Sequence, residues 1–294
     1  MFGILTALLT IIHVVAFTPT SFNYNFFTLP RTQLACSSDF NICTAIAGSK
    51  IHLYQYYPSG YTFVSSAEVV CSGSPSCTLV KNYISEDGTK SISYSYTDSS
   101  YKIYSIANGT LTFLQSIIYV SPVESLKPVK GSYLLLGNSS NIELYLFNTA
   151  TSQYALNYTA NVTSSTSSTF SILPSGTFVR LRVDSGGFFQ LDIYTLDNVT
   201  GAYSFVTIGI DPASVGTKTV IDAVLAQRGN TTVLITTLII DSTYYFWYRT
   251  IIPTTEFTIQ QIVSASTSPF SDLYITQSGL FLVVATYQNY LCFY

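Results

Sequence analysis

The chain has 294 residues, a net charge of −3, 9 % charged residues and 15 % aromatic residues. Soluble domains average about 25 % charged residues, and disordered chains combine high charge with low hydrophobicity, so this composition excludes a disordered protein. The scattered Lys and Arg residues exclude the basic surface that nucleic-acid binding needs. We expect a β-sheet protein with a sizeable core, whose surface is polar through Ser, Thr, Asn and Tyr.

The N-terminal segment Phe2–Ala16 is apolar and short. A membrane-spanning helix needs about 20 apolar residues, whereas the core of a secretory signal peptide needs about 7–15. Val14-Val15-Ala16 places small residues where a signal peptidase cleaves. We predict that residues 1–16 are a signal peptide and that residues 17–294 form one mature domain without a membrane span. An uncleaved N-terminal anchor is the alternative.

A repeating unit runs along the rest of the chain. A short turn is followed by an apolar strand and then by a Tyr- or Phe-rich strand, at intervals of roughly 40–53 residues, the period of a four-stranded propeller blade. The six turns are Ser37-Ser38-Asp39, Asp87-Gly88, Lys130-Gly131, Ser175-Gly176, Arg228-Gly229 and Ser278-Gly279.

The second repeat gives the clearest strand pattern. Its four strands are expected at Thr78–Ile84, Ser91–Thr97, Tyr101–Ile106 and Leu111–Ile118. Apolar and polar residues alternate in the second of them, which indicates a half-buried strand. Asn108-Gly109 lies between the last two, and Asn-Gly between such runs favours a tight hairpin.

The last repeat supplies only three strands, at Asp272–Thr276, Leu280–Tyr287 and Tyr290–Tyr294. The strand-like run Phe22–Leu29 has no repeat of its own. Because a missing strand exposes unpaired backbone groups, we predict that Phe22–Leu29 completes the last blade and closes the ring.

This periodicity and strand pattern, from Phe22 to Tyr294, resembles that of β-propeller proteins such as the WD40-like and YVTN-like groups. The resemblance does not extend to motifs, since Trp-Asp dipeptides and Tyr-Val-Thr-Asn repeats are missing and no glycine pair recurs from repeat to repeat as in kelch proteins. It implies an all-β fold, a six-bladed β-propeller closed by an N-terminal strand. Because sandwich strands also recur every 8–12 residues, a pair of β-sandwiches or a β-solenoid is the alternative.

Five cysteines remain in the mature chain, and in an oxidising compartment they should pair. Cys71 and Cys77 bracket a turn-rich loop. Cys36 and Cys43 flank a turn symmetrically, so an antiparallel hairpin places them opposite each other. We predict these two disulfides and a free thiol at Cys292. The alternative pairs Cys292 with Cys36 or Cys43.

Six Asn-x-Ser/Thr triplets are predicted to be N-glycosylation sites, since a secreted chain exposes them to glycosylation. Most lie in or beside predicted turns, where a glycan disturbs no packing. They begin at Asn108, Asn138, Asn157, Asn161, Asn198 and Asn230.

Catalytic candidates are few. His52 is the one His after signal removal, which argues against a His-cluster zinc site and a Ser-His-Asp relay. Asp222 and Asp272 lie on predicted inner strands, where propeller glycosidases carry paired carboxylates. The competing interpretation is that both simply line a water-filled channel. A sialidase is less favoured, because only Ser85-Glu86-Asp87-Gly88-Thr89 partly matches an Asp-box turn.

The sequence therefore predicts a secreted, N-glycosylated, non-catalytic β-propeller that acts outside the cell or on its surface, with no cofactor. We expect an interaction or structural module, because uncharged Tyr-rich surfaces suit contact with proteins and glycans. Self-assembly into a filament or coat is a further expectation, since low charge gives little repulsion. The alternative is a carbohydrate-active enzyme that uses Asp222 and Asp272.

Overall fold

The computed structural model describes most of the chain between Leu34 and Phe293. All regular elements in this part are β-strands, and none of its residues belongs to a helix long and apolar enough to span a membrane. The described residues are 34–37, 39, 41–58, 60–74, 76–119, 125–129, 132–138, 140–162, 165, 167–197, 199–209, 218–228, 231–240, 243–252, 260–262, 270–275, 282–286 and 291–293.

The strands form antiparallel sheets of chain neighbours, five with four strands and one with three among the described residues. The first three sheets contain β1 (Leu34–Cys36), β2 (Ile42–Ala47), β3 (Lys50–Tyr57) and β4 (Gly60–Glu68); β5 (Leu79–Ile84), β6 (Lys90–Ser95), β7 (Ser100–Ala107) and β8 (Thr110–Ile118); and β9 (Ser125–Val129), β10 (Tyr133–Gly137), β11 (Asn141–Asn148) and β12 (Gln153–Asn161). The others contain β13 (Ser167–Ile172), β14 (Phe178–Val183), β15 (Phe189–Leu196) and β16 (Tyr203–Gly209); β17 (Lys218–Arg228), β18 (Thr231–Ile240), β19 (Thr243–Ile252) and β20 (Gln260–Ile262); and β21 (Phe270–Ile275), β22 (Leu282–Thr286) and β23 (Leu291–Phe293).

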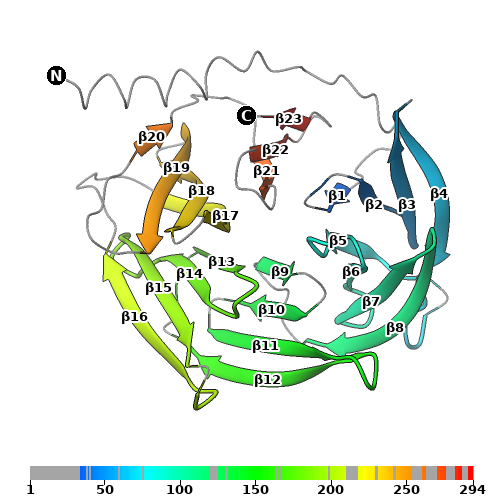
Figure 1. Cartoon of the computed structure of the whole chain (residues 1–294), viewed down its shortest axis with the longest axis horizontal. Coiled ribbons are helices and arrows are strands. Elements are labelled where there is room, and N and C mark those ends of the chain that lie inside the picture. Colours follow the sequence, from blue (N-terminus) through cyan, green and yellow to red (C-terminus); the bar gives the residue numbers. More distant parts are fainter. Residues whose placement is uncertain are drawn as a thin grey trace.

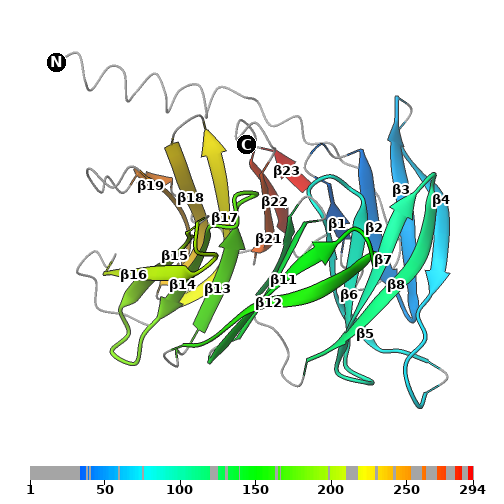
Figure 2. The ribbon, with the colours of Figure 1, turned by 60° about the horizontal axis from the view of Figure 1, so that its bottom comes forward.

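The sheets are arranged around a common centre (Figure 1). The first strand of each sheet lies nearest the centre, and the fourth strands β4, β8, β12, β16 and β20 lie at the periphery. The turned view shows the sheets standing side by side around the ring (Figure 2). The predicted strand order is therefore observed, from the inside outward. The proposed closing strand Phe22–Leu29 lies outside the described residues.

The core lies between neighbouring sheets. Leu134 and Leu136 of the third sheet pack with Ile92 and Ile103 of the second, and all four are completely buried. Burial of such a side chain stabilises a fold by about 1.5–3 kcal/mol. Leu181 and Leu191 of the fourth sheet pack in the same way with Leu234 and Leu238 of the fifth. The alternating apolar residues of each strand thus hold adjacent sheets together.

One glycine lets two sheets approach closely. A side chain at Gly137, the last residue of β10, would collide with the ring of Phe170 on β13. Phe170 is fully buried and belongs to the cluster between the third and fourth sheets. We conclude that Gly137 is needed here for close packing.

The first turn of the first sheet and the first turn of the second sheet have the same pattern of hydrogen bonds. In the first, the Ser37 hydroxyl donates to Asp39 (2.6 Å), whose carboxylate accepts the backbone N–H of Asn41 (3.0 Å). In the second, Ser85 donates to Asp87 (2.6 Å), which accepts the N–H of Thr89 (3.0 Å). Asp in a turn stabilises the local backbone in this way. These contacts explain why Asp recurs at these turns.

Both predicted disulfides are present in the structure. Cys36 and Cys43 lie directly opposite each other on β1 and β2, as the symmetric flanking of the turn indicated. Cys71 is joined to Cys77 across the loop between the first and second sheets. Bridges that close such short loops stabilise a fold by about 2 kcal/mol.

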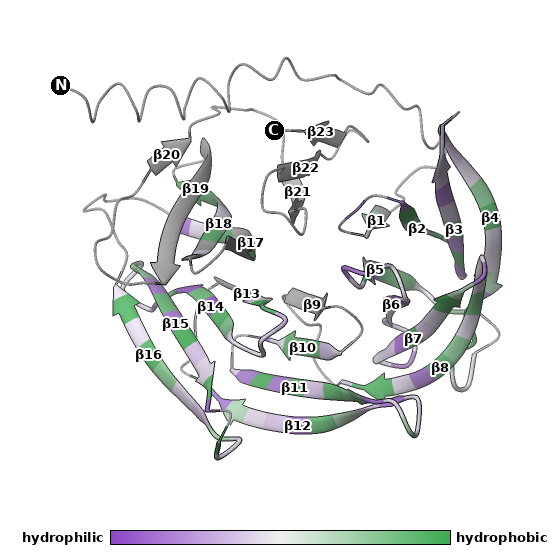
Figure 3. Ribbon diagram, viewed as in Figure 1, coloured by the Kyte–Doolittle hydropathy of each residue, from purple (hydrophilic) through white to green (hydrophobic). Residues whose placement is uncertain are grey.

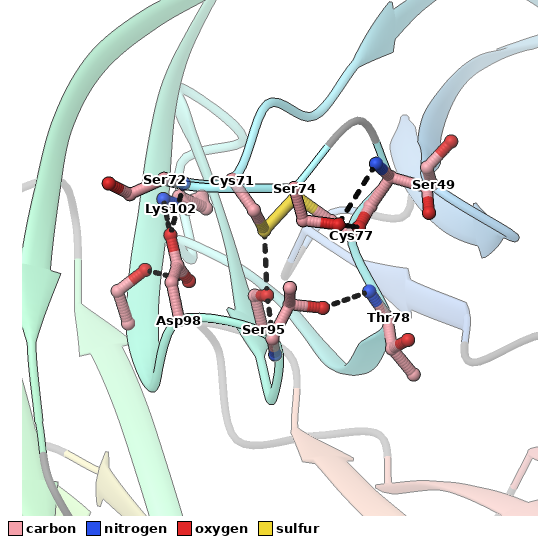
Figure 4. Close-up of a disulfide and its surroundings, with 12 residues drawn as sticks. Ser49, Cys71, Ser72, Ser74, Cys77, Thr78, Ser95, Asp98 and Lys102 are labelled. Carbon is pink, nitrogen blue, oxygen red and sulfur yellow. Dashed lines mark hydrogen bonds and ion pairs between the residues drawn. A yellow bond between two sulfur atoms is a disulfide. The ribbon is translucent and has the colours of Figure 1, made fainter.

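The Cys71–Cys77 loop is anchored to the second sheet (Figure 4). Asp98, in the turn between β6 and β7, accepts the N–H of Ser72 (3.2 Å) and pairs with Lys102 Nζ (2.6 Å). Burial disfavours the ionised Asp98, but hydrogen bonds from Lys102, Ser100 and Ser72 outweigh it and lower the pKa of this carboxyl below 3.8. Lys102 also donates to Ser116 on β8 (3.3 Å), so this polar group supports the outer strand as well.

Candidate interaction surface

The most regular feature of the periphery is a repeated side-chain pair. In each of the first four sheets, a Tyr on the third strand lies opposite an apolar residue on the outer strand. The pairs are Tyr54 with Phe63, Tyr104 with Phe113, Tyr145 with Leu156, and Tyr194 with Phe205. Three of the four are aromatic pairs, with ring centroids 5.5–5.9 Å apart. The repeat therefore extends to individual residues.

The outer members of these pairs are exposed. Phe63, Phe113, Leu156 and Phe205, which we call the outer apolar ring, have 51, 53, 55 and 63 % of their surface accessible. Their Tyr partners lie deeper. Burial, with a smaller contribution from the negative charge of Glu68, raises the pKa of Tyr104 to about 12, and burial chiefly raises that of Tyr194 to about 12. Tyr104, Tyr145 and Tyr194 are buried and Tyr54 is half-buried, so each exposed apolar residue packs on a Tyr that lies deeper.

The outer strands that carry this ring are almost uncharged. Across β4, β8, β12 and β16, Glu68 at the end of β4 is the one charged residue. Figure 3 shows apolar segments on the outer strands β8, β12 and β16. Monomeric proteins commonly protect edge strands with Lys, Pro or bulges. Charge does not protect these edges.

Bulges protect three of the four edges. The register of the outer pair shifts by one residue beside Tyr54, Tyr104 and Tyr145. Val64, Leu114 and Asn157 are the extra residues on the outer strands. In the fourth sheet, β15 and β16 pair without a shift from Gln190 to Leu196. β16 is therefore the one outer strand of these four without a bulge.

β12 has a second form of protection. The side-chain amide of Gln115 on β8 donates to the carbonyl of Tyr154 (3.0 Å) and accepts the N–H of the same residue (2.7 Å). Gln115 thus occupies edge hydrogen-bonding groups that another strand would need. Among the residues that the structure describes, no side chain forms such a bond with the backbone of β16.

β16 is held to its sheet from within. Thr207 Oγ1 donates to Asp192 (2.7 Å), and Asp192 also binds Arg182 Nε (2.9 Å) and lies 3.6 Å from Arg180 Nη1. All three charged residues are buried. At its first residue, Tyr203 packs on Tyr158 of β12, with ring centroids 4.6 Å apart. These contacts fix β16 in place and leave Phe205 and Val206 exposed.

Asp222 and Asp272 are found on the inner strands β17 and β21, as predicted. They occupy equivalent positions, because each follows a one-residue register shift against the second strand of its sheet. Asp222 lies opposite Thr237 and Asp272 opposite Ala285. Their role as a carboxylate pair stays a prediction.

The remaining predicted sites are distributed over the surface. Asn108, Asn157 and Asn161 are exposed and Asn138 is half-buried, whereas Asn198 and Asn230 lie outside the described residues. Cys292 lies on β23 opposite Val284, and its free thiol stays a prediction. In the described part of the chain, no three His, Cys, Asp or Glu residues are grouped as metal ligands.

A small cleft lies between the first two sheets at the Asn108-Gly109 turn. Its volume is about 240 Å³, and Ile42, Tyr54 and Ile106 contribute to its lining. Pockets for small organic ligands usually measure about 300–1,000 Å³. Of this cleft and the outer apolar ring, the ring is the better candidate for a functional surface, and sequence reasoning could have found it from the recurring Tyr and Phe positions.

Comparison with known proteins identifies the fold. No family model matches the sequence, and no curated protein matches it. Solved structures do match. A periplasmic gluconolactonase of Pseudomonas aeruginosa has a TM-score of 0.62 at 14 % identity, over 88 % of this chain and 78 % of its own. A Lactobacillus plantarum protein has a TM-score of 0.60 at 16 % identity, over 87 % of this chain and 79 % of its own.

Hsv2 of Kluyveromyces lactis is similar too, with a TM-score of 0.58 at 11 % identity, over 90 % of this chain and 73 % of its own. These proteins are of the β-propeller type, and the chain shares that fold. At such low identity the likeness concerns the fold alone. It does not favour the WD40-like group over other propellers.

Proposed function

We propose that this protein is a secreted, N-glycosylated, six-bladed β-propeller, closed by Phe22–Leu29, that acts as an extracellular or cell-surface interaction and structural module. The observation that carries the proposal is the outer apolar ring on uncharged strands. The two disulfides are consistent with an oxidising compartment. No catalytic role is assigned to this surface.

The partner that this surface fits best is a second copy of the chain. An exposed, flat, apolar edge strand is a template for pairing with another strand. β16 is an edge strand without a bulge, and its neighbouring residues Phe205 and Val206 expose 63 and 62 % of their surface. Two β16 strands can pair antiparallel around a twofold axis, which gives the self-complementary contact of most dimers.

The energetics favour association through more than one outer strand. Covering one large apolar side chain contributes about 1.5–3 kcal/mol, and a stable interface covers more than about 1,000 Å². A single β16 contact is therefore expected to be weak. Side-chain contacts of Phe63 on β4 and Phe113 on β8, two further exposed members of the outer apolar ring, add to the β16 contact, and such repetition is the arrangement that a filament or coat requires.

Electron microscopy of native secreted material tests the proposal. We expect dimers or larger assemblies that contact each other through the propeller periphery. Monomers alone, with no binding to glycans, proteins or cell surfaces, would leave the interaction role without support.

A carbohydrate-active enzyme is the second candidate, favoured by the equivalent positions of Asp222 and Asp272 on inner strands. Glycosidase carboxyl groups lie about 5–9.5 Å apart. A glycosidase or lyase activity that Asp222→Asn abolishes would favour this candidate over the interaction module. If the protein is purely structural, Asp222→Asn should leave its assembly unchanged.

A further inference from the structure

The structure distinguishes the predicted glycosylation sites by what their side chains already do. A glycan on Asn needs an Nδ2 that points into solvent, since the sugar is bulky and polar. Four of the six sites belong to the described residues: Asn108, Asn138, Asn157 and Asn161.

Asn138 is engaged in the fold. Its Nδ2 donates to the hydroxyl of the buried Tyr119 (3.3 Å), while its Oδ1 accepts the N–H groups of Ser140 (2.9 Å) and Asn141 (2.8 Å). The side chain thus closes the turn between β10 and β11. A sugar on Nδ2 would have to occupy the space toward Tyr119, so a glycan here would cost folding stability.

Asn157 and Asn161 are in the opposite situation. Both are exposed on β12, and within the described residues neither side-chain amide forms a hydrogen bond. Asn157 is the extra residue of the bulge and has no residue opposite it on β11. Asn161 is the last residue of the strand. A glycan at either position displaces no packing.

Gln115, Asn157 and Asn161 lie at successive places along the edge of β12. Gln115 occupies the backbone groups of Tyr154 near the start of the strand. Asn157 follows three residues later, and Asn161 ends the strand. At about 3.4 Å per residue, a glycan on each covers the rest of the edge.

We propose that Asn157 and Asn161 carry N-linked glycans in the secreted protein, that Asn138 does not, and that these glycans shield β12 so that β16 is left as the open edge. This inference rests on secretion, as proposed above. It adds a modification pattern that decides which edge associates.

The reaction is an ordinary glycosyl transfer. The Nδ2 of Asn157 attacks the anomeric carbon of an oligosaccharide on a lipid pyrophosphate donor. An N-glycosidic bond forms, the bond from the anomeric carbon to the pyrophosphate oxygen breaks, and Nδ2 loses one proton. The lipid pyrophosphate leaves, and no redox change occurs.

Glycan mapping tests the site assignment. The full chain, behind a heterologous cleavable signal, is secreted from a eukaryotic cell, so the result does not depend on its own N-terminal segment. Enzymatic deglycosylation in ¹⁸O water followed by peptide mass spectrometry should label Asn157 and Asn161 and leave Asn138 unlabelled. A labelled Asn138, or an unlabelled Asn157 or Asn161, would overturn the assignment.

Thr159→Ala and Thr159→Ser test the shielding separately. The Ala variant removes the glycan signal at Asn157 but keeps Asn157, whereas the Ser variant preserves the signal and serves as the matched control. We expect the Ala variant to self-associate at a concentration at least about tenfold lower than the Ser variant. Equal association of the two variants, with Asn157 occupied in the Ser variant, would overturn the shielding. It would leave the proposed association through β16 standing.

Discussion

The outer strands β12 and β16 belong to neighbouring sheets but differ in how they expose their edges. β12 contains a bulge, receives the Gln115 amide on Tyr154 and carries two glycosylation signals. β16 pairs in regular register and exposes Phe205 and Val206. Both have an apolar residue opposite a Tyr, so the difference lies in protection of the edge and not in composition.

This difference shows that one repeat can supply either a closed or an open edge. An unpaired strand exposes backbone donors and acceptors that another chain can use. Both strands carry a residue of the outer apolar ring, Leu156 on β12 and Phe205 on β16. They differ in backbone register and in the side chains that cover the edge. The proposed association would therefore be controlled at the strand edge.

Removing the support of β16 should have the largest effect. In Asp192→Ala, Arg180 and Arg182 lose their buried carboxylate and Thr207 loses its acceptor. We expect a loss of about 3–5 kcal/mol in the free energy of unfolding, because an uncompensated charge stays buried. Urea unfolding monitored by circular dichroism measures it.

Glu68→Gln is the matched control for that loss of charge. Glu68 pairs with Lys50 at 3.4 Å, and both side chains are 52 % exposed. Exposed ion pairs contribute little to stability, so this substitution should leave the free energy of unfolding almost unchanged. Equal destabilisation by the two substitutions would mean that the buried charges do not hold β16.

A smaller effect is expected beneath β8, where Lys102 pairs with Asp98 and donates a hydrogen bond to Ser116. Asp98→Asn should cost about 1–3 kcal/mol at pH 7, since hydrogen bonds to charged groups contribute in this range. The pKa of Asp98 is lowered on folding, so its contribution is complete above about pH 4 and is lost as the pH falls through the folded-state pKa.

Unfolding curves of the wild type and Asp98→Asn between pH 7 and pH 2 measure that contribution. The two stabilities should converge below about pH 4. A difference that stays constant over this range would show that the carboxylate charge is not the source of the stabilisation.

Gln115→Ala should make β12 more like β16. The N–H and C=O of Tyr154 lose their partner, which costs about 1 kcal/mol and speeds amide hydrogen exchange at Tyr154 about fivefold. Gln153→Ala removes the same type of side chain from an exposed position on β12 and is the control. Unchanged exchange at Tyr154 would contradict the protective role of Gln115.

Much of the sheet architecture could be predicted from sequence, because turn residues and alternation are local signals. The four strands of the second sheet and the turns at Asp87 and Asn108 are examples, as are the paired cysteines across the first hairpin. These features depend on residues a few positions apart. Their physical cause is contained in the segment itself.

The edge features could not be predicted in the same way. Gln115 contacts Tyr154, which belongs to another sheet and lies 39 residues away. Asp192 contacts Arg180, Arg182 and Thr207, so this group spans three strands. A bulge depends on the register of two strands together, so Asn157 appears in the sequence as an ordinary strand residue. Only the assembled sheets show which strand stays open.

Sedimentation velocity of Phe205→Lys and Leu156→Lys tests the central claim most directly. Both replace an exposed ring residue with the same charge, and both variants should stay folded, since Phe205→Lys removes about 0.5–1.5 kcal/mol of aromatic pairing with Tyr194. We expect Phe205→Lys to weaken self-association by about 10–100-fold and Leu156→Lys, on the protected strand, to leave it near the wild-type value. Equal association constants for the two variants, or loss of association in Leu156→Lys alone, would contradict the account.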